Sequence, residues 1–346
     1  LLTNGSELTL KNNDFRIING SGGGHIALSL ALNSTLNFDK NTIKADNDKG
    51  NLFLLAQIGN FTYTNNHSRL EKSKISLIDV VNSAFISNST FLSVSNYSSG
   101  ELSGVIISQA DGVHSADIEI SKNKFLMPKY FNETYIGGHN AVYFRNYIDF
   151  DIKMNYLIGA GEYNIIIKST HNIASTEIVC SNNISLLAGL LAKGVAGVKF
   201  YNNTVVNSES SGGISFMSGD DGSNYGKSKA YNNIVVNSID DTPLVNIKDE
   251  ATGGNHELDY NIYYSERLTP FEYLGVSKTF AEWQALGFDT NSIFLTETQF
   301  NGLFTDYDNG DYSLAVGSIA IGFGEDLGND YREGLDETTN WGSDEE

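Results

Sequence analysis

Short apolar runs followed by an asparagine recur along most of the chain. The repeated pattern is an apolar residue, two further residues, Asn, one residue and a second apolar residue, as in Phe38-Asp-Lys-Asn41-Thr-Ile43. Further copies are centred on Asn13, Asn123, Asn155, Asn182, Asn203, Asn233 and Asn261, with weaker copies at Asn66 and Ser89. Nine steps separate Asn13 from Asn261, an average of about 27 residues per step. A period of this length is typical of a repeat architecture.

Each repeat contains a second short run with the composition of a β-strand. Such runs lie at residues 141–144, 164–167, 189–192 and 213–216, and Gly, Asn, Ser and Asp separate them from the rest. No helical periodicity of ten residues or more appears before about residue 278. Short strands without intervening helices predict a solenoid of parallel strands, in which each Asn lies at the same corner of its coil. The amides can then hydrogen-bond from coil to coil as a ladder.

On these repeats, the chain resembles the right-handed parallel β-helix proteins of the pectate-lyase-like superfamily, over roughly residues 8–265. The resemblance implies an all-β fold, a right-handed parallel β-helix of about ten coils over residues 1–265. Residues 266–346 would form a C-terminal capping segment. The resemblance is specific for architecture and not for activity, because this fold hosts lyases, hydrolases, epimerases, adhesins and phage tailspikes.

The capping segment is predicted to contain one short α-helix. Thr279-Phe-Ala-Glu282 forms a capping box, Phe280 and Trp283 lie on one helical face, and Gly287 ends the helix. The order of strand, helix and strand from residue 260 to residue 314 resembles the closing region of many secreted β-helix proteins. In those proteins Pro usually follows the Gly-Ser pair, where this chain has Ile319. The resemblance implies an extracellular or cell-surface location.

Composition excludes several function classes. The chain has 42 acidic and 22 basic residues, a formal charge of −20, which argues against nucleic-acid binding and against docking on an anionic membrane. No apolar run is long enough for a membrane-spanning helix. The single cysteine, Cys180, excludes an internal disulfide and is interpreted as a packing residue. His25, His67, His114 and His256 are isolated in the sequence, and surface or turn positions are expected for them.

Alternation along the second set of strands predicts two outward columns. If Val142 and Phe144 and their equivalents point inward, the first outward column is Tyr143, Ile166, Leu191, Ser215 and Asn246. The second outward column is Arg145, Lys168, Lys193, Met217 and Lys248. We call this second set the basic column. Like charges on successive coils repel, so this column predicts a surface that holds carboxylate or sulfate groups. The alternative is a solvated face whose cations serve solubility.

A lyase would use the same column, because removing a proton beside a uronate carboxylate requires that carboxylate to be neutralised and a base to be near. In lyases of this superfamily, Lys and Arg on the solenoid face fill these roles, often with calcium. The resemblance therefore implies Lys168, Arg145 and His171 as catalytic candidates. Substrate-binding candidates are Tyr143, Lys193, Lys248, His139 and Glu162. The motifs of polygalacturonase-type hydrolases, classical pectate lyases and chondroitinase-B-like lyases are absent.

A candidate calcium site lies near the C-terminal end. Asp306, Asp308 and Asp311 surround Gly310, and carboxylate oxygens are the ligands that calcium prefers. The full EF-hand pattern is absent, and a solvated turn before a strand over residues 311–314 is the alternative.

Three roles remain open. The first is an extracellular protein that binds an acidic polysaccharide or cell-surface glycan and, as a polysaccharide lyase, cleaves it by β-elimination. The second is an adhesin-like structural stalk, and the third is a trimeric phage tailspike on a virion surface. The chain begins without Met, so we expect it to be processed or part of a longer protein.

Overall fold

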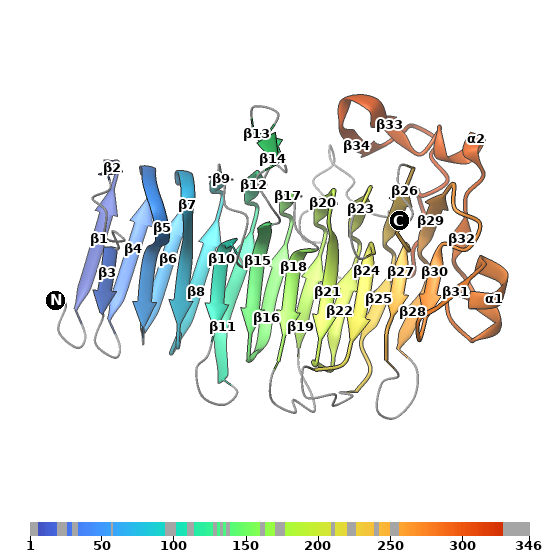
Figure 1. Cartoon of the computed structure of the whole chain (residues 1–346), viewed down its shortest axis with the longest axis horizontal. Helices are drawn as coiled ribbons and strands as arrows, with labels where there is room; N and C mark the ends of the chain where they lie inside the picture. Colours follow the sequence, from blue (N-terminus) through green and yellow to red (C-terminus); the bar gives the residue numbers. More distant parts are fainter. Residues whose placement is uncertain are drawn as a thin grey trace. The chain divides into compact units, whose positions relative to one another are not determined.

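The computed structural model describes most of the chain. The described residues are 6–18, 26–29, 34–56, 58–93, 102–108, 114–126, 130–131, 134–135, 139–159, 163–169, 177–208, 212–219, 226–238, 242–249 and 256–327. They divide between two compact units, Leu1–His171 and Asn172–Glu346. Each unit is a stack of coils built from short parallel strands, as predicted (Figure 1).

In the first unit, each coil contributes strands to three faces. The first face consists of β1 (Glu7–Lys11), β4 (Thr35–Asp39), β6 (Asn60–Thr64), β8 (Ser83–Ser87), β11 (His114–Ser121) and β16 (Tyr147–Lys153). The second face contains β2 (Asp14–Ile18), β9 (Thr90–Ser93), β12 (Lys124–Leu126) and β17 (Tyr156–Ile158). The third face contains β3 (Ile26–Ser29), β10 (Leu102–Ser108), β15 (His139–Arg145) and β18 (Tyr163–Lys168). A small antiparallel hairpin joins β13 (Tyr130–Phe131) to β14 (Thr134–Tyr135).

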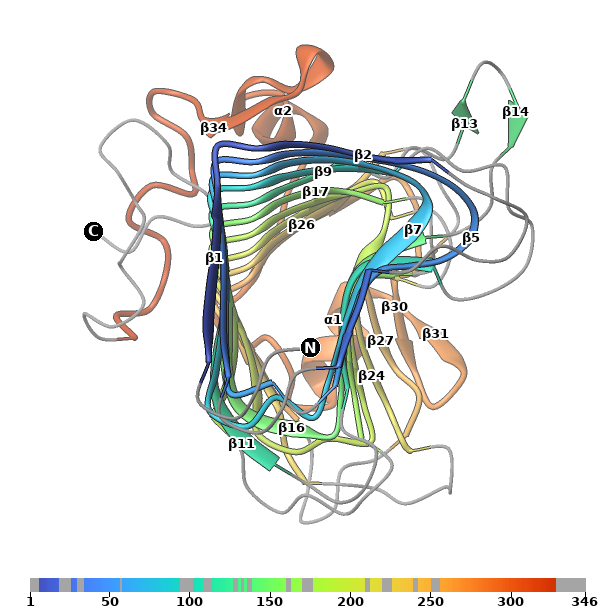
Figure 2. The ribbon, with the colours of Figure 1, turned by 90° about the vertical axis from the view of Figure 1, so that its left-hand side faces the viewer.

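Two long strands of the first unit pass from the second face to the third. β5 (Thr42–Ala56) pairs with both β2 and β3, and β7 (His67–Ile78) pairs with both β9 and β10. Viewed from the N-terminal end, the chain runs clockwise from β1 through β2 to the face that holds β5 and β7, and successive coils recede from the viewer (Figure 2). The winding is therefore right-handed, as parallel crossovers require.

The second unit repeats the three faces with shorter strands. Its first face contains β19 (Ile178–Ser181), β22 (Val198–Tyr201), β25 (Lys229–Tyr231) and β28 (Glu257–Asp259). Its second face contains β20 (Ile184–Leu186), β23 (Thr204–Val206), β26 (Ile234–Asn237), β29 (Ile262–Ser265) and β32 (Ile293–Phe294). Its third face contains β21 (Gly189–Lys193), β24 (Ile214–Met217), β27 (Val245–Ile247) and β30 (Phe271–Tyr273), and β31 (Val276–Lys278) turns back antiparallel to β30.

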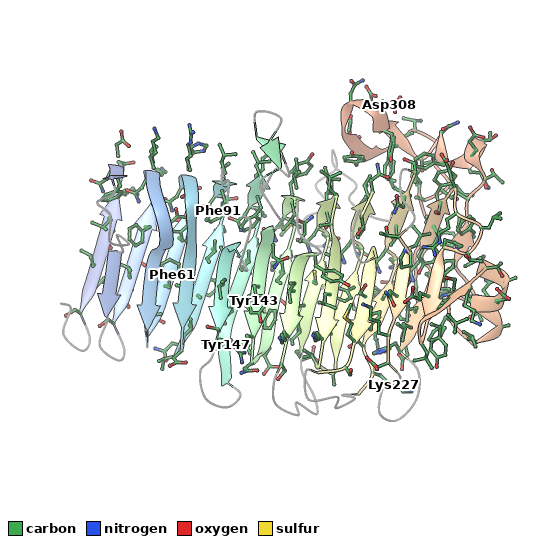
Figure 3. All side chains as sticks on the ribbon, in the orientation of Figure 1. Phe61, Phe91, Tyr143, Tyr147, Lys227 and Asp308 are labelled. Atoms are coloured by element: carbon green, nitrogen blue, oxygen red, sulfur yellow. The ribbon has the colours of Figure 1, made fainter. Side chains whose placement is uncertain are left out.

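Large apolar side chains fill the interior of the coils. In the first unit, Phe61, Tyr63 and Phe91 are fully buried, and the rings of Tyr63 and Phe91 stack with centroids 5.7 Å apart (Figure 3). Stacked aromatic rings on successive coils contribute beyond the area that each buries. Val142 and Phe144, which alternation predicts to point inward, are buried as well. Among the described residues, no helix is long and apolar enough to cross a membrane.

The predicted asparagine ladder is present in both units. In the first unit, Oδ1 of Asn155 accepts hydrogen bonds from the backbone N and the Nδ2 of Asn123, at 3.0 and 3.1 Å. Asn155 Nδ2 in turn donates to the carbonyl of Ile120 at 2.9 Å. Asn66 and Ser89, the weaker copies in the sequence, also belong to the ladder, because Asn66 N donates to Ser89 Oγ at 3.0 Å. The side chains of Asn155 and Ser89 therefore satisfy backbone groups of the neighbouring coil.

One position of the predicted ladder was wrong by a single residue. Asn183, and not Asn182, donates from its backbone N to Asn203 Oδ1 at 3.1 Å. Asn182 has a φ of 55° and is the left-handed residue that precedes the ladder position. Lys122 and Met154 adopt the same conformation before Asn123 and Asn155. The turn requires a left-handed residue directly before the ladder position, and Asn tolerates this conformation well. In an Asn-Asn pair the first Asn therefore takes the left-handed position and the second joins the ladder. The spacing of apolar residues alone does not reveal this order.

The predicted helix closes the last coil of the second unit. Helix α1 (Phe280–Ala285) begins with the capping box of Thr279 and Glu282, and Gly287 follows its end with a φ of 93°. Trp283 is fully buried, and its ring stacks on Phe271 of β30 at 5.0 Å. The helix thus covers apolar side chains of the last coil, as a solenoid end requires.

A buried carboxylate ends the ladder of the second unit. Asp289 is fully buried and accepts hydrogen bonds from Asn261 Nδ2 at 2.8 Å and Ser292 Oγ at 2.6 Å, which bind Oδ1. Its Oδ2 accepts from Trp283 Nε1 at 2.7 Å and from the hydroxyl of Tyr263 at 3.1 Å. Burial raises the pKa of this carboxyl despite the four donors. Asp289 therefore joins the ladder to the capping helix.

The rest of the C-terminal segment packs on the second face of its unit. It contains the single-turn helix α2 (Glu297–Phe300), β33 (Phe304–Asp306), the 3-10 turn η1 (Tyr307–Asn309) and β34 (Asp311–Leu314), the strand predicted at 311–314. The ring of Phe300 stacks on Tyr264 of β29 at 4.0 Å. The Tyr307 hydroxyl accepts from Asn207 Nδ2 at 2.8 Å and lies 2.9 Å from Ser238 Oγ.

The ladder yields the first testable prediction. Asn155→Ala should lower the free energy of unfolding by about 3 kcal/mol, because it leaves the backbone N of Asn123 and the carbonyl of Ile120 buried without these hydrogen bonds. Asn82→Ala, at an exposed residue of the same unit, should change it by less than about 0.5 kcal/mol. Urea unfolding followed by circular dichroism measures both. Equal effects of the two substitutions would contradict a structural role for the ladder.

Candidate functional site

In the first unit, two cations of the basic column lie side by side. Arg145 ends β15 and Lys168 ends β18, and the two residues are in register in adjacent parallel strands. Arg145 is exposed and Lys168 is partly exposed. Phe144 and Ile167, which precede them, are buried, so alternation directs both cations to the outer side of the third face. Strands in such a sheet are about 4.8 Å apart.

In the second unit, the same column has a different composition. Lys193 ends β21 in register with Met217 of β24. Lys248 follows β27 directly, and its backbone N donates to the carbonyl of Phe216 at 3.0 Å. Lys193 and Met217 are partly exposed and Lys248 is exposed. The strand register predicted from sequence is therefore confirmed within each unit.

Most side chains of the first outward column are buried, although strand alternation predicted that they face solvent. Ser215 is fully buried, Asn246 is 4% exposed, and Leu191 is 5% exposed. Tyr143 is 7% exposed, which leaves little of its ring for stacking against a sugar (Figure 3). Alternation in a strand decides the side on which a residue lies, but it does not decide how much of the side chain stays exposed.

The remaining lyase candidates are placed only in part. His171 and Glu162 lie outside the described residues. His139 is the first residue of β15, in register with Leu102, and its side chain also lies outside the described part of the structure. The geometry that a β-elimination would need around Lys168 and Arg145 therefore stays a prediction.

The carboxylates of the candidate calcium site serve a turn. Asp306 Oδ2 accepts from Asn309 Nδ2 at 2.8 Å, and Asp311 Oδ1 accepts from Ser313 Oγ at 2.6 Å. Asp306 and Asp311 are paired across the β33–β34 hairpin, and Asp308 is exposed in η1 between them (Figure 3). Over the residues that the structure describes, no three His, Cys, Asp or Glu side chains are grouped so that they could hold a metal ion.

Lysines on the first face of the second unit pair with carboxylates. Lys199 Nζ lies 2.8 Å from Glu177 Oε2, and Lys229 Nζ lies 2.8 Å from Glu257 Oε2. Glu177 is exposed and the other three residues are partly exposed, and an ion pair near the surface contributes little to stability. Lys199 therefore provides a comparison for Lys193 of the basic column, on another face of the same unit.

Two buried titratable groups lie in the core of the second unit. Cys180 is fully buried and burial raises the pKa of its thiol, which agrees with a packing role and not with a nucleophile. His256 is also buried, contrary to the expected surface or turn position. Its Nδ1 accepts from the backbone N of Ser228 at 3.0 Å, and its ring stacks on Phe216 at 4.4 Å. The residues before His256 are typical of a loop, so the sequence alone does not predict that this side chain is buried.

Comparison of the chain with protein-family models, curated proteins and solved structures finds no match.

His256 predicts a pH dependence of stability. Burial lowers its pKa from 6.5 to about 4, so the unfolded chain binds a proton between these pH values that the folded chain does not. The free energy of unfolding should therefore fall by about 3 kcal/mol as the pH falls from about 6.5 to about 4. Asp289, whose pKa burial raises, opposes this trend, so the histidine must be isolated by substitution.

His256→Asn retains an acceptor for the backbone N of Ser228 and removes the titration. The unfolding free energy of this variant should depend less on pH in the same window than that of the wild type, as measured by urea unfolding at several pH values. Parallel pH profiles for the two proteins would show that His256 does not titrate in the folded state as its burial implies.

Proposed function

We propose that the protein binds an acidic polysaccharide through the basic column. The observation that carries this proposal is the in-register pair of Arg145 and Lys168 on the outer side of adjacent strands. The two cations lie side by side in a protein whose formal charge is −20. An anionic group can contact both side chains, and a polymer that carries one anion per sugar supplies such groups in a row.

The chemistry of the two side chains suits carboxylate and sulfate groups. The guanidinium of Arg145 can bind a carboxylate with two parallel hydrogen bonds, and the ammonium of Lys168 acts as a point charge. The spacing of about 4.8 Å between strands is similar to the length of one sugar residue in an extended chain. The second unit carries cations of its own at the equivalent positions, Lys193 and Lys248, which can bind anionic groups in the same way, with Met217 between them as an apolar contact.

Membership of the pectate-lyase-like superfamily and an extracellular location belong to the same proposal. The parallel coils and the asparagine ladder support the first. The second follows from the proposed ligand, because acidic polysaccharides of this kind occur outside cells. Cleavage by β-elimination is a further step of the proposal. In it, Lys168 would be the base that removes the proton beside the uronate carboxylate, and Arg145 would neutralise that carboxylate.

Substitutions on the third and the first face of the second unit test the proposal. The wild-type chain should bind at least one polymer among pectate, alginate and sulfated glycans, more weakly as salt concentration rises. Lys193→Ala should weaken binding by about 1 kcal/mol, a factor of about five. Lys199→Ala makes the same change of charge on the first face and should leave the affinity unchanged. Isothermal titration calorimetry measures all three proteins.

Lys168→Ala in the first unit separates binding from cleavage. It should also weaken binding, and if the protein is a lyase it should abolish the ultraviolet absorbance of unsaturated products. Binding without any such absorbance would show that the protein binds the polysaccharide and does not cleave it. Absence of binding across the panel, or equal effects of Lys193→Ala and Lys199→Ala, would show that the basic column is a solvated face.

A further inference from the structure

The first face of the first unit carries one large aromatic side chain on its outer side. In β8, Ser83, Phe85 and Ser87 alternate with Ala84 and Ile86, which are fully buried. Phe85 therefore points away from the core, and it retains partial exposure. It is in register with Thr62 of β6 on one side and with Glu119 of β11 on the other. The ring thus lies within the face and not at its edge.

A set of outward positions on β4, β6 and β8 carries no charge. Apart from Phe85 they bear hydroxyl or amide groups, and together with Phe85 we call them the neutral face: Thr35, Asn37, Asn60, Thr62, Thr64, Ser83 and Ser87. All are partly exposed. In a chain with 42 acidic residues, eight uncharged outward positions on three adjacent strands depart from the general composition of the surface.

Four carboxylates border the neutral face, and two of them are paired with lysines. Of the others, Glu7 is in register with Thr35 and accepts from Asn37 Nδ2 at 3.0 Å, and Asp117 is in register with Ser83. Asp39 lies 2.8 Å from Lys11 Nζ, and the hydrogen bond from this lysine is the main reason that the pKa of Asp39 falls to about 2. Glu119 lies 3.2 Å from Lys153 Nζ. Each lysine offsets the negative charge of its carboxylate, so Asp39 and Glu119 repel or attract a ligand on this face only weakly.

Hydrogen bonds between coils hold the polar side chains in place. Ser83 Oγ donates to Asn60 Oδ1 at 2.9 Å, and Asn60 Nδ2 donates to Thr35 Oγ1 at 3.2 Å. The hydroxyl groups keep further lone pairs after these bonds are formed, so they can still bind a ligand. Because the side chains are ordered before binding, a ligand does not have to immobilise them.

We propose that the neutral face binds an uncharged polysaccharide chain, with one sugar ring packed on Phe85. A sugar ring offers an apolar C–H face to the phenyl ring and hydroxyl groups to the surrounding Ser, Thr and Asn side chains. Nucleic acids and polyuronates require cations, which these positions lack. The core of a protein–protein interface is enriched in aromatic residues, Met and Arg, and here one aromatic residue stands among small polar ones. This site is independent of the basic column, which lies on the third face.

Native gel electrophoresis in the presence of uncharged polysaccharides tests the proposal. The probes are hydroxyethyl cellulose, glucomannan, xylan and a mixed-linkage glucan. At least one should retard the wild-type chain, and binding measured in solution should be insensitive to salt because no charge is involved. Phe85→Ser should weaken binding roughly tenfold, whereas Phe85→Tyr, which keeps the ring, should retain it.

Control variants show whether the ring of Phe85 itself is responsible for binding. Val81→Ser removes an exposed apolar side chain near β8 and should not change retardation. If Phe85→Ser does not fold, Thr62→Lys places a charged side chain beside the ring and should abolish binding in a folded protein. Binding of acidic polysaccharides should be unaffected by Phe85→Ser, so failure of this proposal is distinguishable from failure of the proposed function.

Three outcomes would overturn the proposal. The first is the absence of retardation of the wild-type chain by all four polymers. The second is equal retardation of the wild type and Phe85→Ser. The third is a wild-type dimer, measured by light scattering, that Phe85→Ser converts to a monomer, because this would assign the face to a second copy of the chain.

Discussion

A buried amide that hydrogen-bonds to the next coil is the interaction on which each unit depends. Parallel coils turn sharply after the first face, and the turn leaves backbone groups that no strand can satisfy. The ladder satisfies them with one side chain per coil, which accepts from the backbone N of its neighbour and donates to a carbonyl. The coils therefore repeat the same corner, and the strands on either side of it are held in register.

Register in turn decides what the surfaces look like. Because the coils do not slip, an outward residue of one strand lies beside the outward residue of the next, and side chains of one kind form columns. Arg145 and Lys168 are neighbours for this reason, although 23 positions separate them in the sequence. Phe85 and Thr62 meet in the same way on the first face. A solenoid thus converts a sequence repeat into extended surfaces of uniform chemistry, which suit extended ligands.

The end of the solenoid shows how the regular interaction is closed. The Nδ2 of Asn261 donates to the carboxylate of Asp289, whereas the earlier asparagines of the ladder in the same unit donate to the amide of the next Asn. The same carboxylate accepts from Nε1 of Trp283 on the capping helix. A carboxylate offers acceptors only, so several donors of the last coil and the cap can converge on it. The helix is therefore attached to the coil through the ladder itself and through apolar contacts such as that of Trp283 with Phe271.

The sequence by itself determined the parallel β-helix, the ladder, the inward residues and the helix at Thr279, because each depends on local spacing or capping that repeats along the chain. The tertiary structure decided the rest. It selected Asn183 over Asn182, because the turn requires a left-handed residue before the ladder position. It buried Ser215, Asn246 and His256, because strand alternation and turn composition do not determine how closely the surrounding side chains pack. It placed Phe85 beside the uncharged Thr62, since only the register of neighbouring coils determines which outward residues meet.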